Sequence, residues 1–146
     1  MITIKNEKQM KKYYVKKVNT YMFEDDVEFL CNINVEANII AWDINAKDIL
    51  AWNVFADDIT AKEICVRNIN AWCINADNIT ADNIKAEEII AHNIIYYAIC
   101  VAYNNIECNS INGRRANAKH FVLDGELIVG GNKKWVNQFM NYISII

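Results

Sequence analysis

Isoleucine recurs every fifth residue through the middle of the chain, and alanine follows it two places later. Thirteen consecutive positions at steps of five, from Ile39 to Ile99, are isoleucine or valine, and the residue before each is Asn, Asp or Glu except at Cys73 and Ala98. The repeating unit is therefore A-x-[ND]-I-x. A helix would spread these isoleucines around its cylinder, because five residues advance it by about 500°. A straight strand would send successive isoleucines to opposite faces.

A solenoid that turns a corner once per repeat satisfies this period. Each short side then directs Ile and the Ala two places later inward, and the residue between them outward, by the alternation of a strand. Asn and Asp suit the corners, since their side chains bond local main-chain amides and tolerate turn geometry. The pattern predicts an all-β solenoid over residues 32–112.

This repeat resembles that of the pentapeptide-repeat proteins, in which an aliphatic centre follows Asn or Asp. The resemblance extends from about Asn32 to Ile111, and it implies a right-handed quadrilateral β-helix with four repeats per coil. The phase differs, since the family carries its small residue two places before the large one. The order of the inward pair in this chain therefore leaves a three-sided coil open as the alternative.

The two flanks are predicted to be caps, because a solenoid needs polar or covered ends to stay soluble. In the N-terminal cap, residues 1–31, the segments KYYVKKV and VEFL are typical of strands. The period slips by two residues after Ile99, and FVLDGELIVGG predicts either a hairpin-like segment, with Asp124 and Gly125 as its turn, or a strand. In the C-terminal cap, residues 113–146, the apolar ending YISII predicts the contacts of a homodimer.

Composition places the chain among single-domain globular proteins. It has 146 residues, 53% of them hydrophobic and 23% charged, with no proline and four glycines, which disfavours a turn-rich sandwich. The longest apolar runs fall short of the ~18 residues of a membrane span, and the N-terminus lacks the apolar core of a signal peptide. Five cysteines without a CxxC pair favour reduced thiols and the cytoplasm.

Charge is uneven along the chain. Residues 32–112 hold eleven acids and four bases, a formal charge of −7, whereas the N- and C-terminal flanks carry +1 and +3. Like charge along a regular rod keeps it soluble. The alternative is that a rod of regularly spaced carboxylates imitates nucleic acid. The resemblance implies this too, because some pentapeptide-repeat proteins occupy the DNA groove of a topoisomerase. The candidate partner-binding acids are Asp57, Asp58, Asp77, Asp82, Glu87 and Glu88.

With four repeats per coil, residues twenty apart would stack at about 4.8 Å. This places Trp52, Trp72 and His92 on one face. Exposed tryptophans are typical of the energetic centres of interfaces. An aromatic face of Trp42, Trp52 and Trp72 is therefore a second candidate site for a partner. Alternatively, these tryptophans bind no partner and only cover the side chains next to them along the stacked strands.

The sequence lacks the patterns that are typical of catalysis. His92 and His120 have no metal-ligand spacing to the cysteines, and the four glycines form no phosphate-binding loop. We therefore expect no enzyme activity, no cofactor and no metal. A basic loop of Arg114, Arg115 and Lys119 is interpreted as a contact for phosphate or an acidic partner, or as a solvated loop.

The sequence predicts a cytoplasmic, non-enzymatic binding protein. The first hypothesis is an acidic rod that mimics nucleic acid and inhibits or protects a nucleic-acid-handling enzyme, such as a topoisomerase, a restriction enzyme or a CRISPR effector. The alternative is an adaptor whose tryptophan-bearing face docks a protein partner. Neither hypothesis requires direct binding of nucleic acid or of a membrane. A steep loss of affinity with salt distinguishes mimicry from a tryptophan-centred contact.

Overall fold

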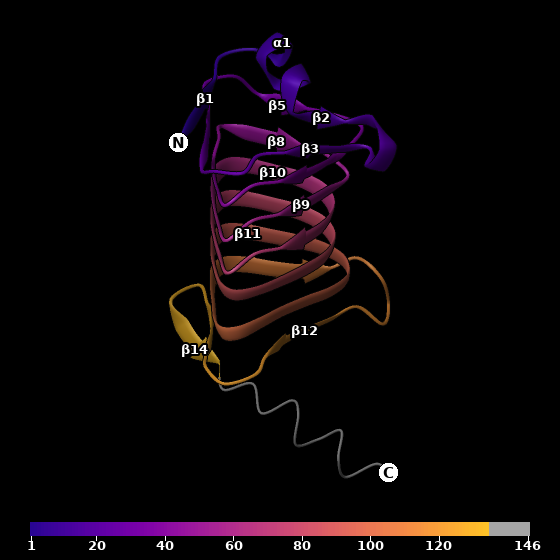
Figure 1. Ribbon diagram of the computed structural model, residues 1–146. Coiled ribbons are helices and arrows are strands. Elements are labelled where there is room, and N and C mark those ends of the chain that lie inside the picture. The colour runs from indigo at the N-terminus through magenta and orange to yellow at the C-terminus, as the bar shows by residue number, and fades with distance from the viewer. Residues whose placement is uncertain (135–146) are drawn as a thin grey trace.

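The fold is an all-β solenoid of coils stacked along one axis, as predicted (Figure 1). The computed structural model describes residues 1–134, so the YISII ending, predicted to form dimer contacts, lies outside the described residues. The N-terminal elements are β1 (Ile2–Ile4), α1 (Glu7–Met10), η1 (Lys11–Tyr13), β2 (Tyr14–Val15), η2 (Lys16–Val18), β3 (Thr20–Met22), β4 (Val27–Phe29) and β5 (Ile33–Asn34). The remaining strands are β6 (Asn38–Ile40), β7 (Asp43–Asn45), β8 (Asp48–Leu50), β9 (Asn53–Phe55), β10 (Asp58–Asn70), β11 (Cys73–Gly113), β12 (Lys119–Val122), β13 (Leu127–Val129) and β14 (Asn132–Lys134).

Each coil contains three repeats, because parallel strands pair residues that are fifteen apart. Ile59 of β10 is in register with Ile44 of β7 on one side and with Ile74 of β11 on the other. The predicted four-sided cross-section is therefore wrong, and the three-sided alternative is correct. A triangle turns more sharply at its corners than a square does. The alanine at each corner supplies the small inward group that such a turn needs.

The core is a column of isoleucines with alanines at the corners. Ile44, Ile59 and Ile74 are all buried, as are the alanines two places after them. The strands cover the Asn/Asp–Ile–x part of each repeat, and the bend falls at Ala–x. The inward pair was predicted correctly, but Asn and Asp begin the strands instead of forming the corners.

Two ladders of side-chain hydrogen bonds run parallel to the axis. In the first, Nδ2 of Asn53, Asn68 and Asn83 each donates to Oδ1 of the asparagine one coil earlier, over 2.7, 2.6 and 2.8 Å. In the second, Asn78 donates to Glu63 and Asn93 donates to Asn78. An amide suits this position because it both donates and accepts, so each coil is tied to both of its neighbours.

The repeat shifts after the buried residue Tyr96. This tyrosine stands where earlier coils carry an alanine or a valine, and its hydroxyl lies 2.9 Å from Nδ1 of His120. The large ring displaces the following chain, so Cys100 is buried and Ile99 is 46% exposed. Ile99 was predicted to face inward and does not. The slip itself is confirmed, since Ser110 bonds Asn93 from seventeen residues away.

The N-terminal segment stacks directly on the solenoid. Strand β4 pairs with β7, β1 pairs with β4, and β3 pairs with β6, all in parallel. The predicted VEFL strand is confirmed as β4. The predicted KYYVKKV strand is wrong, because only Tyr14–Val15 is extended, between two 3-10 turns. Asn19, with a φ of 49°, ends the second turn and allows the chain to reverse into β3.

At the C-terminal end, β12 and β13 continue the stack. Each pairs in parallel with β11, so the predicted hairpin between them is wrong, and Asp124 and Gly125 lie at a corner of the coil. A Cβ on Gly125 would stand 1.6 Å from the carbonyl oxygen of Asn104, which excludes any side chain there. The antiparallel hairpin joins β13 to β14 through Gly130 and Gly131, both with positive φ.

Removing one rung of the first ladder should destabilise the fold. Asn68→Ala deletes two side-chain hydrogen bonds, each with a net contribution of roughly 0.5–1.5 kcal/mol, so we expect a loss of about 1–3 kcal/mol in urea unfolding. The control is Asn70→Ala, two residues further along the same strand and facing solvent. Equal effects of the two substitutions would contradict a structural role for the ladder.

The shift after Tyr96 is tested by a pair of isoleucines. Ile94 is fully buried, so Ile94→Ala should lower the free energy of unfolding by about 2–5 kcal/mol. Ile99 occupies the same place in the repeat but faces solvent, so Ile99→Ala should change it by less than about 0.5 kcal/mol. Similar losses from both variants would mean that the five-residue period continues unbroken.

Candidate functional site

The three-sided solenoid has three long edges. Each edge is formed by the outward-facing residues at the same corner of successive coils. On the first edge, main-chain amides connect residues one coil apart: Trp42 donates to Asp25, Asp57 to Trp42, Trp72 to Asp57 and Glu87 to Trp72. Tyr103 lines a depression together with Trp72 and Glu87, and Asp124 donates its amide to Tyr103. The acid–aromatic edge, as we name it, is the alternating series Asp25, Trp42, Asp57, Trp72, Glu87, Tyr103 and Asp124.

The aromatic side chains of this edge are open to solvent. Trp42, Trp72 and Tyr103 are 59%, 65% and 50% exposed. By contrast, Trp52 on another edge is 37% exposed. Large aromatic surfaces left this open are typical of contact sites for a partner.

A second acidic series lies beside the acid–aromatic edge. Asp26, Asp43 and Asp58 line one depression on successive coils, and the series continues through Cys73 to Glu88. We name Asp26, Asp43, Asp58 and Glu88 the acid column. Burial raises the pKa of the Cys73 thiol, and the negative charges of Asp58 and Glu88 raise it further.

The acid column occupies the place that asparagine occupies in the first ladder. All these residues directly precede a buried isoleucine or valine. A carboxylate has no hydrogen to donate to its neighbour, so stacked carboxylates repel where stacked amides bind. Asp43 is partly compensated, because its Oδ1 accepts from the main-chain amide of Asp58 over 3.2 Å. A departure from a rule that the rest of the fold obeys is typical of a functional surface.

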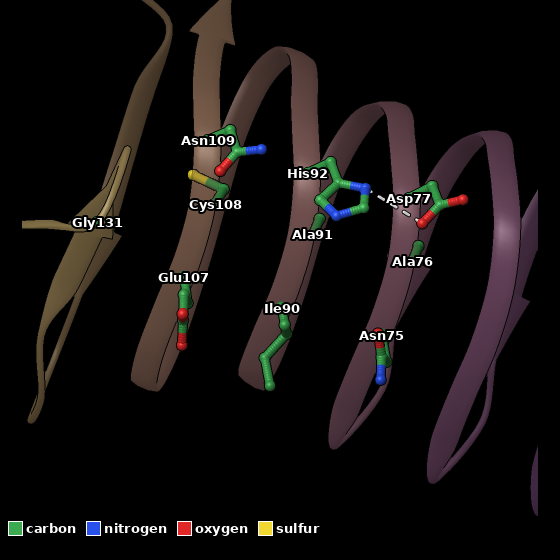
Figure 2. Close-up of a pocket in the computed structure, with 10 residues that line it drawn as sticks. All are labelled: Asn75, Ala76, Asp77, Ile90, Ala91, His92, Glu107, Cys108, Asn109 and Gly131. Atoms are coloured by element: carbon green, nitrogen blue, oxygen red, sulfur yellow. Dashed lines mark ion pairs between the residues drawn. The ribbon is translucent and has the colours of Figure 1, made fainter.

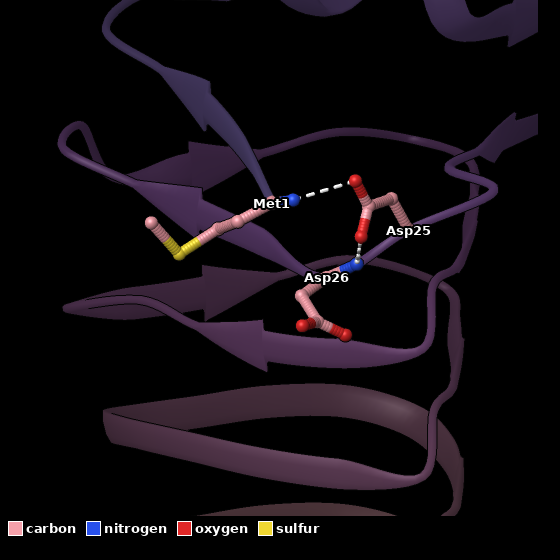
Figure 3. Close-up of polar contacts among 3 residues, drawn as sticks. All are labelled: Met1, Asp25 and Asp26. Carbon is pink, nitrogen blue, oxygen red and sulfur yellow. Dashed lines mark hydrogen bonds and ion pairs between the residues drawn. The ribbon is translucent and has the colours of Figure 1, made fainter.

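Among residues 1–131, the one ion pair on the acid–aromatic edge lies at its N-terminal end (Figure 3). The amino group of Met1 donates to Oδ2 of Asp25 over 2.6 Å, and the amide of Asp26 donates to Oδ1 of the same carboxylate over 2.8 Å. The bond from the amino terminus, followed by that from Asp26, lowers the pKa of Asp25. Among residues 1–131, Asp57 and Glu87 form no ion pair, so their charge is available to a partner.

The predicted acidic site is only partly brought together. Asp57, Asp58, Glu87 and Glu88 lie on the acid–aromatic edge or in the acid column. Asp77 lies on a second edge with His92, whose Nδ1 is 3.2 Å from its Oδ1. The members of that lysine edge are Lys47, Lys62, Asp77 and His92.

The third edge carries two arginines. It also holds one of the three tryptophans of the predicted aromatic face, so that face is divided between two edges. Trp52 lies here, whereas Trp42 and Trp72 share the first edge, so the twenty-residue stacking of Trp52, Trp72 and His92 is wrong. The guanidinium of Arg67 lies 4.9 Å from the ring centroid of Trp52, and that of Arg115 lies 5.6 Å from Tyr97. The arginine edge consists of Trp52, Arg67, Asp82, Tyr97 and Arg115, so Asp82 is also removed from the other acids.

The predicted basic loop follows the last full coil. Arg114 and Arg115 are exposed, and Lys119 begins β12, where it pairs with Ile99. Arg115 is engaged with Tyr97 on the arginine edge, and it lines one depression together with Lys119. A role for Arg114, Arg115 and Lys119 in partner binding stays a prediction.

A depression on the lysine edge brings a cysteine near a histidine and a glutamate (Figure 2). Asp77, His92 and Asn109 form one row on successive coils, and Asn75, Ile90 and Glu107 form another. Cys108 lies beside them, but burial and the charge of Glu107 raise its pKa to about 11. The thiol is therefore protonated near neutral pH, and this group supplies no activated nucleophile. Within the described chain, no group of three or more His, Cys, Asp or Glu residues could hold a metal ion.

Comparison of the chain with family models, with curated proteins and with solved structures gives no match. The pentapeptide-repeat resemblance therefore rests on the five-residue unit alone. No helix among the described residues is long and apolar enough to cross a membrane.

Sequence reasoning missed five members of this site. It did not single out Asp25, Asp26, Asp43, Tyr103 and Asp124, because a twenty-residue period scatters them. A fifteen-residue period was visible in the asparagines at 38, 53, 68 and 83, and it would have aligned Trp42, Asp57, Trp72 and Glu87. Tyr103 and Asp124 lie after the shift at Tyr96. Extending a fifteen-residue period along the sequence therefore does not reach them.

Replacing an acid of the column with an amide should stabilise the protein. Asp58→Asn removes a repelling charge and supplies a donor for Asp43, so we expect a gain of about 0.2–1 kcal/mol in urea unfolding at low salt. At 1 M salt, where charges are screened beyond about 3 Å, the gain should shrink. Asp82→Asn, beside Arg67, is the control and should give no gain. A loss of stability in Asp58→Asn would contradict repulsion in the column.

Proposed function

We propose that this protein is a non-enzymatic binding protein whose acid–aromatic edge and acid column occupy a basic surface of a nucleic-acid-handling enzyme. A topoisomerase, a restriction enzyme or a CRISPR effector has such a surface, and occupying it would inhibit or protect the enzyme. The single observation that carries the proposal is the gathering of Asp57, Asp58, Glu87 and Glu88 on one side of the rod, unpaired with other described residues. The resemblance to pentapeptide-repeat proteins supports the same function.

The spacing of the charges suits a surface that binds phosphates. Strands one coil apart are separated by about 4.8 Å, so Asp57 and Glu87, like Asp58 and Glu88, are about 9.6 Å apart along the rod. A protein surface that binds nucleic acid neutralises the phosphates with Lys and Arg side chains. Carboxylates spaced along the rod attract such a basic surface over a distance of about a Debye length, roughly 8 Å at physiological salt. This attraction speeds association.

The adaptor alternative is favoured by the exposure of Trp42 and Trp72. These residues alternate with Asp57 and Glu87 on one edge, so aromatic and charged contacts would form with the same partner. We therefore expect an interface with a tryptophan centre and acidic surroundings. Salt should weaken such a complex strongly without abolishing it, since the aromatic contact is insensitive to screening.

A capture experiment with competition tests the proposal. The immobilised protein is incubated with bacterial lysate, and bound proteins are identified by mass spectrometry after elution with duplex DNA. We expect a nucleic-acid-binding enzyme that DNA releases and that the double variant Asp57→Lys/Glu87→Lys does not capture. The matched control is Asp77→Lys/Asp82→Lys, which changes the charge equally on the other two edges and should capture normally.

Two results would contradict the proposal. A partner retained in excess DNA and bound equally by both double variants would mean that the acidity serves solubility alone. A partner lost from the control variant and kept by the edge variant would move the contact to the lysine or arginine edge.

A further inference from the structure

The arginine edge shows how this solenoid holds a guanidinium. Arg67 stands one coil after Trp52, and the stacking of the coils sets its guanidinium 4.9 Å from the centroid of the indole. Arg115 repeats the arrangement on Tyr97 at 5.6 Å. At these separations a cation is attracted by the face of an aromatic ring. An aromatic residue on an edge is therefore a platform for a cation one coil away.

The acid–aromatic edge has the same platforms with the opposite charge between them. Asp57 stands one coil from Trp42 and one coil from Trp72, at the place that Arg67 takes relative to Trp52. Among residues 1–131, no Lys or Arg stacks on Trp42 or Trp72. The two indoles and the carboxylate are thus all accessible, and each is complementary to a cation.

We propose that the acid–aromatic edge is a receptor for arginine side chains of the partner, an inference that rests on the proposed function. One guanidinium lies between the rings of Trp42 and Trp72 and pairs with Asp57. A second lies between Trp72 and Tyr103 and pairs with Glu87. The first site is the stronger, because Lys85 lines the same depression as Glu87 and competes for it.

Arginine fits this site better than lysine does. Its guanidinium is planar, stacks on aromatic faces and forms two parallel hydrogen bonds with a carboxylate. It is also more weakly hydrated than an ammonium, so entering the space between two rings costs less. Arginine is, in addition, abundant on surfaces that bind nucleic acid backbones, which connects this receptor to the proposed partner class.

The geometry also specifies the spacing of the arginines. The two sites are two coils apart, about 9.6 Å along the rod. A polyproline-type chain advances about 3.1 Å per residue and has three residues per turn, so every third side chain points the same way and meets a site. A straight strand would send side chains three residues apart to opposite faces. The partner segment is therefore a polyproline-type segment of the pattern R-x-x-R, lying along the edge.

Labelled peptides on the whole protein test this inference directly. Fluorescence anisotropy is measured with GRGGRGGRG, with its lysine and citrulline counterparts, and with GRGRGRGGG, which carries three arginines at a spacing of two. We expect GRGGRGGRG to bind more tightly than the lysine and spacing-of-two peptides. Citrulline keeps the shape of arginine without its charge, and its peptide should not bind.

Variants then separate stacking from charge. Trp42→Leu/Trp72→Leu removes three cation–aromatic contacts, two at the first site and one at the second, and each contributes about twofold to fivefold. It should therefore weaken binding of GRGGRGGRG about tenfold to hundredfold. Asp57→Asn should weaken it up to about fivefold. Trp52→Leu, on the arginine edge, is the control and should leave binding unchanged within about twofold.

The outcomes distinguish this inference from the proposed function. Equal binding of the arginine and lysine peptides at both spacings, with no effect of the tryptophan variant, would overturn the arginine receptor and leave the acidic edge intact. Absence of binding to any cationic peptide would overturn both. Concentration-dependent dimers in sedimentation that Asp57→Asn dissolves would show that a second copy of this chain occupies the edge, and this too would overturn the inference. Since the peptide series needs only the unaltered protein, misfolding of a variant cannot hide a negative result.

Discussion

The main-chain pairing of residues fifteen apart is the constraint on which the rest of the structure depends. It follows from the fit of three isoleucines inside a coil whose corners are lined by alanine. Because every coil repeats the same register, a residue's place on the outside is set by its position within a fifteen-residue unit. Ladders, edges and columns are all consequences of this pairing. A different number of repeats per coil would have dispersed the acids, the tryptophans and the asparagines around the rod.

The solenoid architecture could be predicted from the sequence, because it follows from the local geometry of helices and strands. Ile at every fifth position and Ala two places later are sufficient to predict a solenoid, because neither a helix nor a straight strand keeps both inside. The number of sides was wrongly predicted as four, with three as the alternative, since the same inward pair serves a triangle and a square. That choice depends on how sharply the chain bends at the alanine, a property of the assembled coil. The shift at Tyr96 is likewise tertiary, because it arises when a ring enters a corner sized for alanine.

The candidate site, like the fold, was predictable in its local features and not in its tertiary arrangement. Acidity and exposed tryptophans were predicted from the sequence, but their grouping was not, because grouping requires the register. Asp77 and Asp82 appeared equivalent to Asp57 along the chain, yet they lie beside a histidine and an arginine on other edges. The acid column is informative for a related reason. Asparagine would satisfy its neighbours there, and carboxylates do not, so the surface departs from what the fold alone favours.

Acid and aromatic residues alternate on the first edge, so the pattern of the edge repeats every two coils. We call each two-coil repeat a division of the rod. Trp42 and Trp72 mark successive divisions thirty residues apart. Duplication of thirty residues within the regular coils would lengthen the edge by one division and leave every existing division in place. Duplication of a single five-residue unit would preserve the core but rotate all later residues to a different edge. The core thus tolerates length changes in steps of five, whereas the outer surface accepts them only in steps of thirty. Selection for recognition would therefore be visible as a length rule in relatives of this chain.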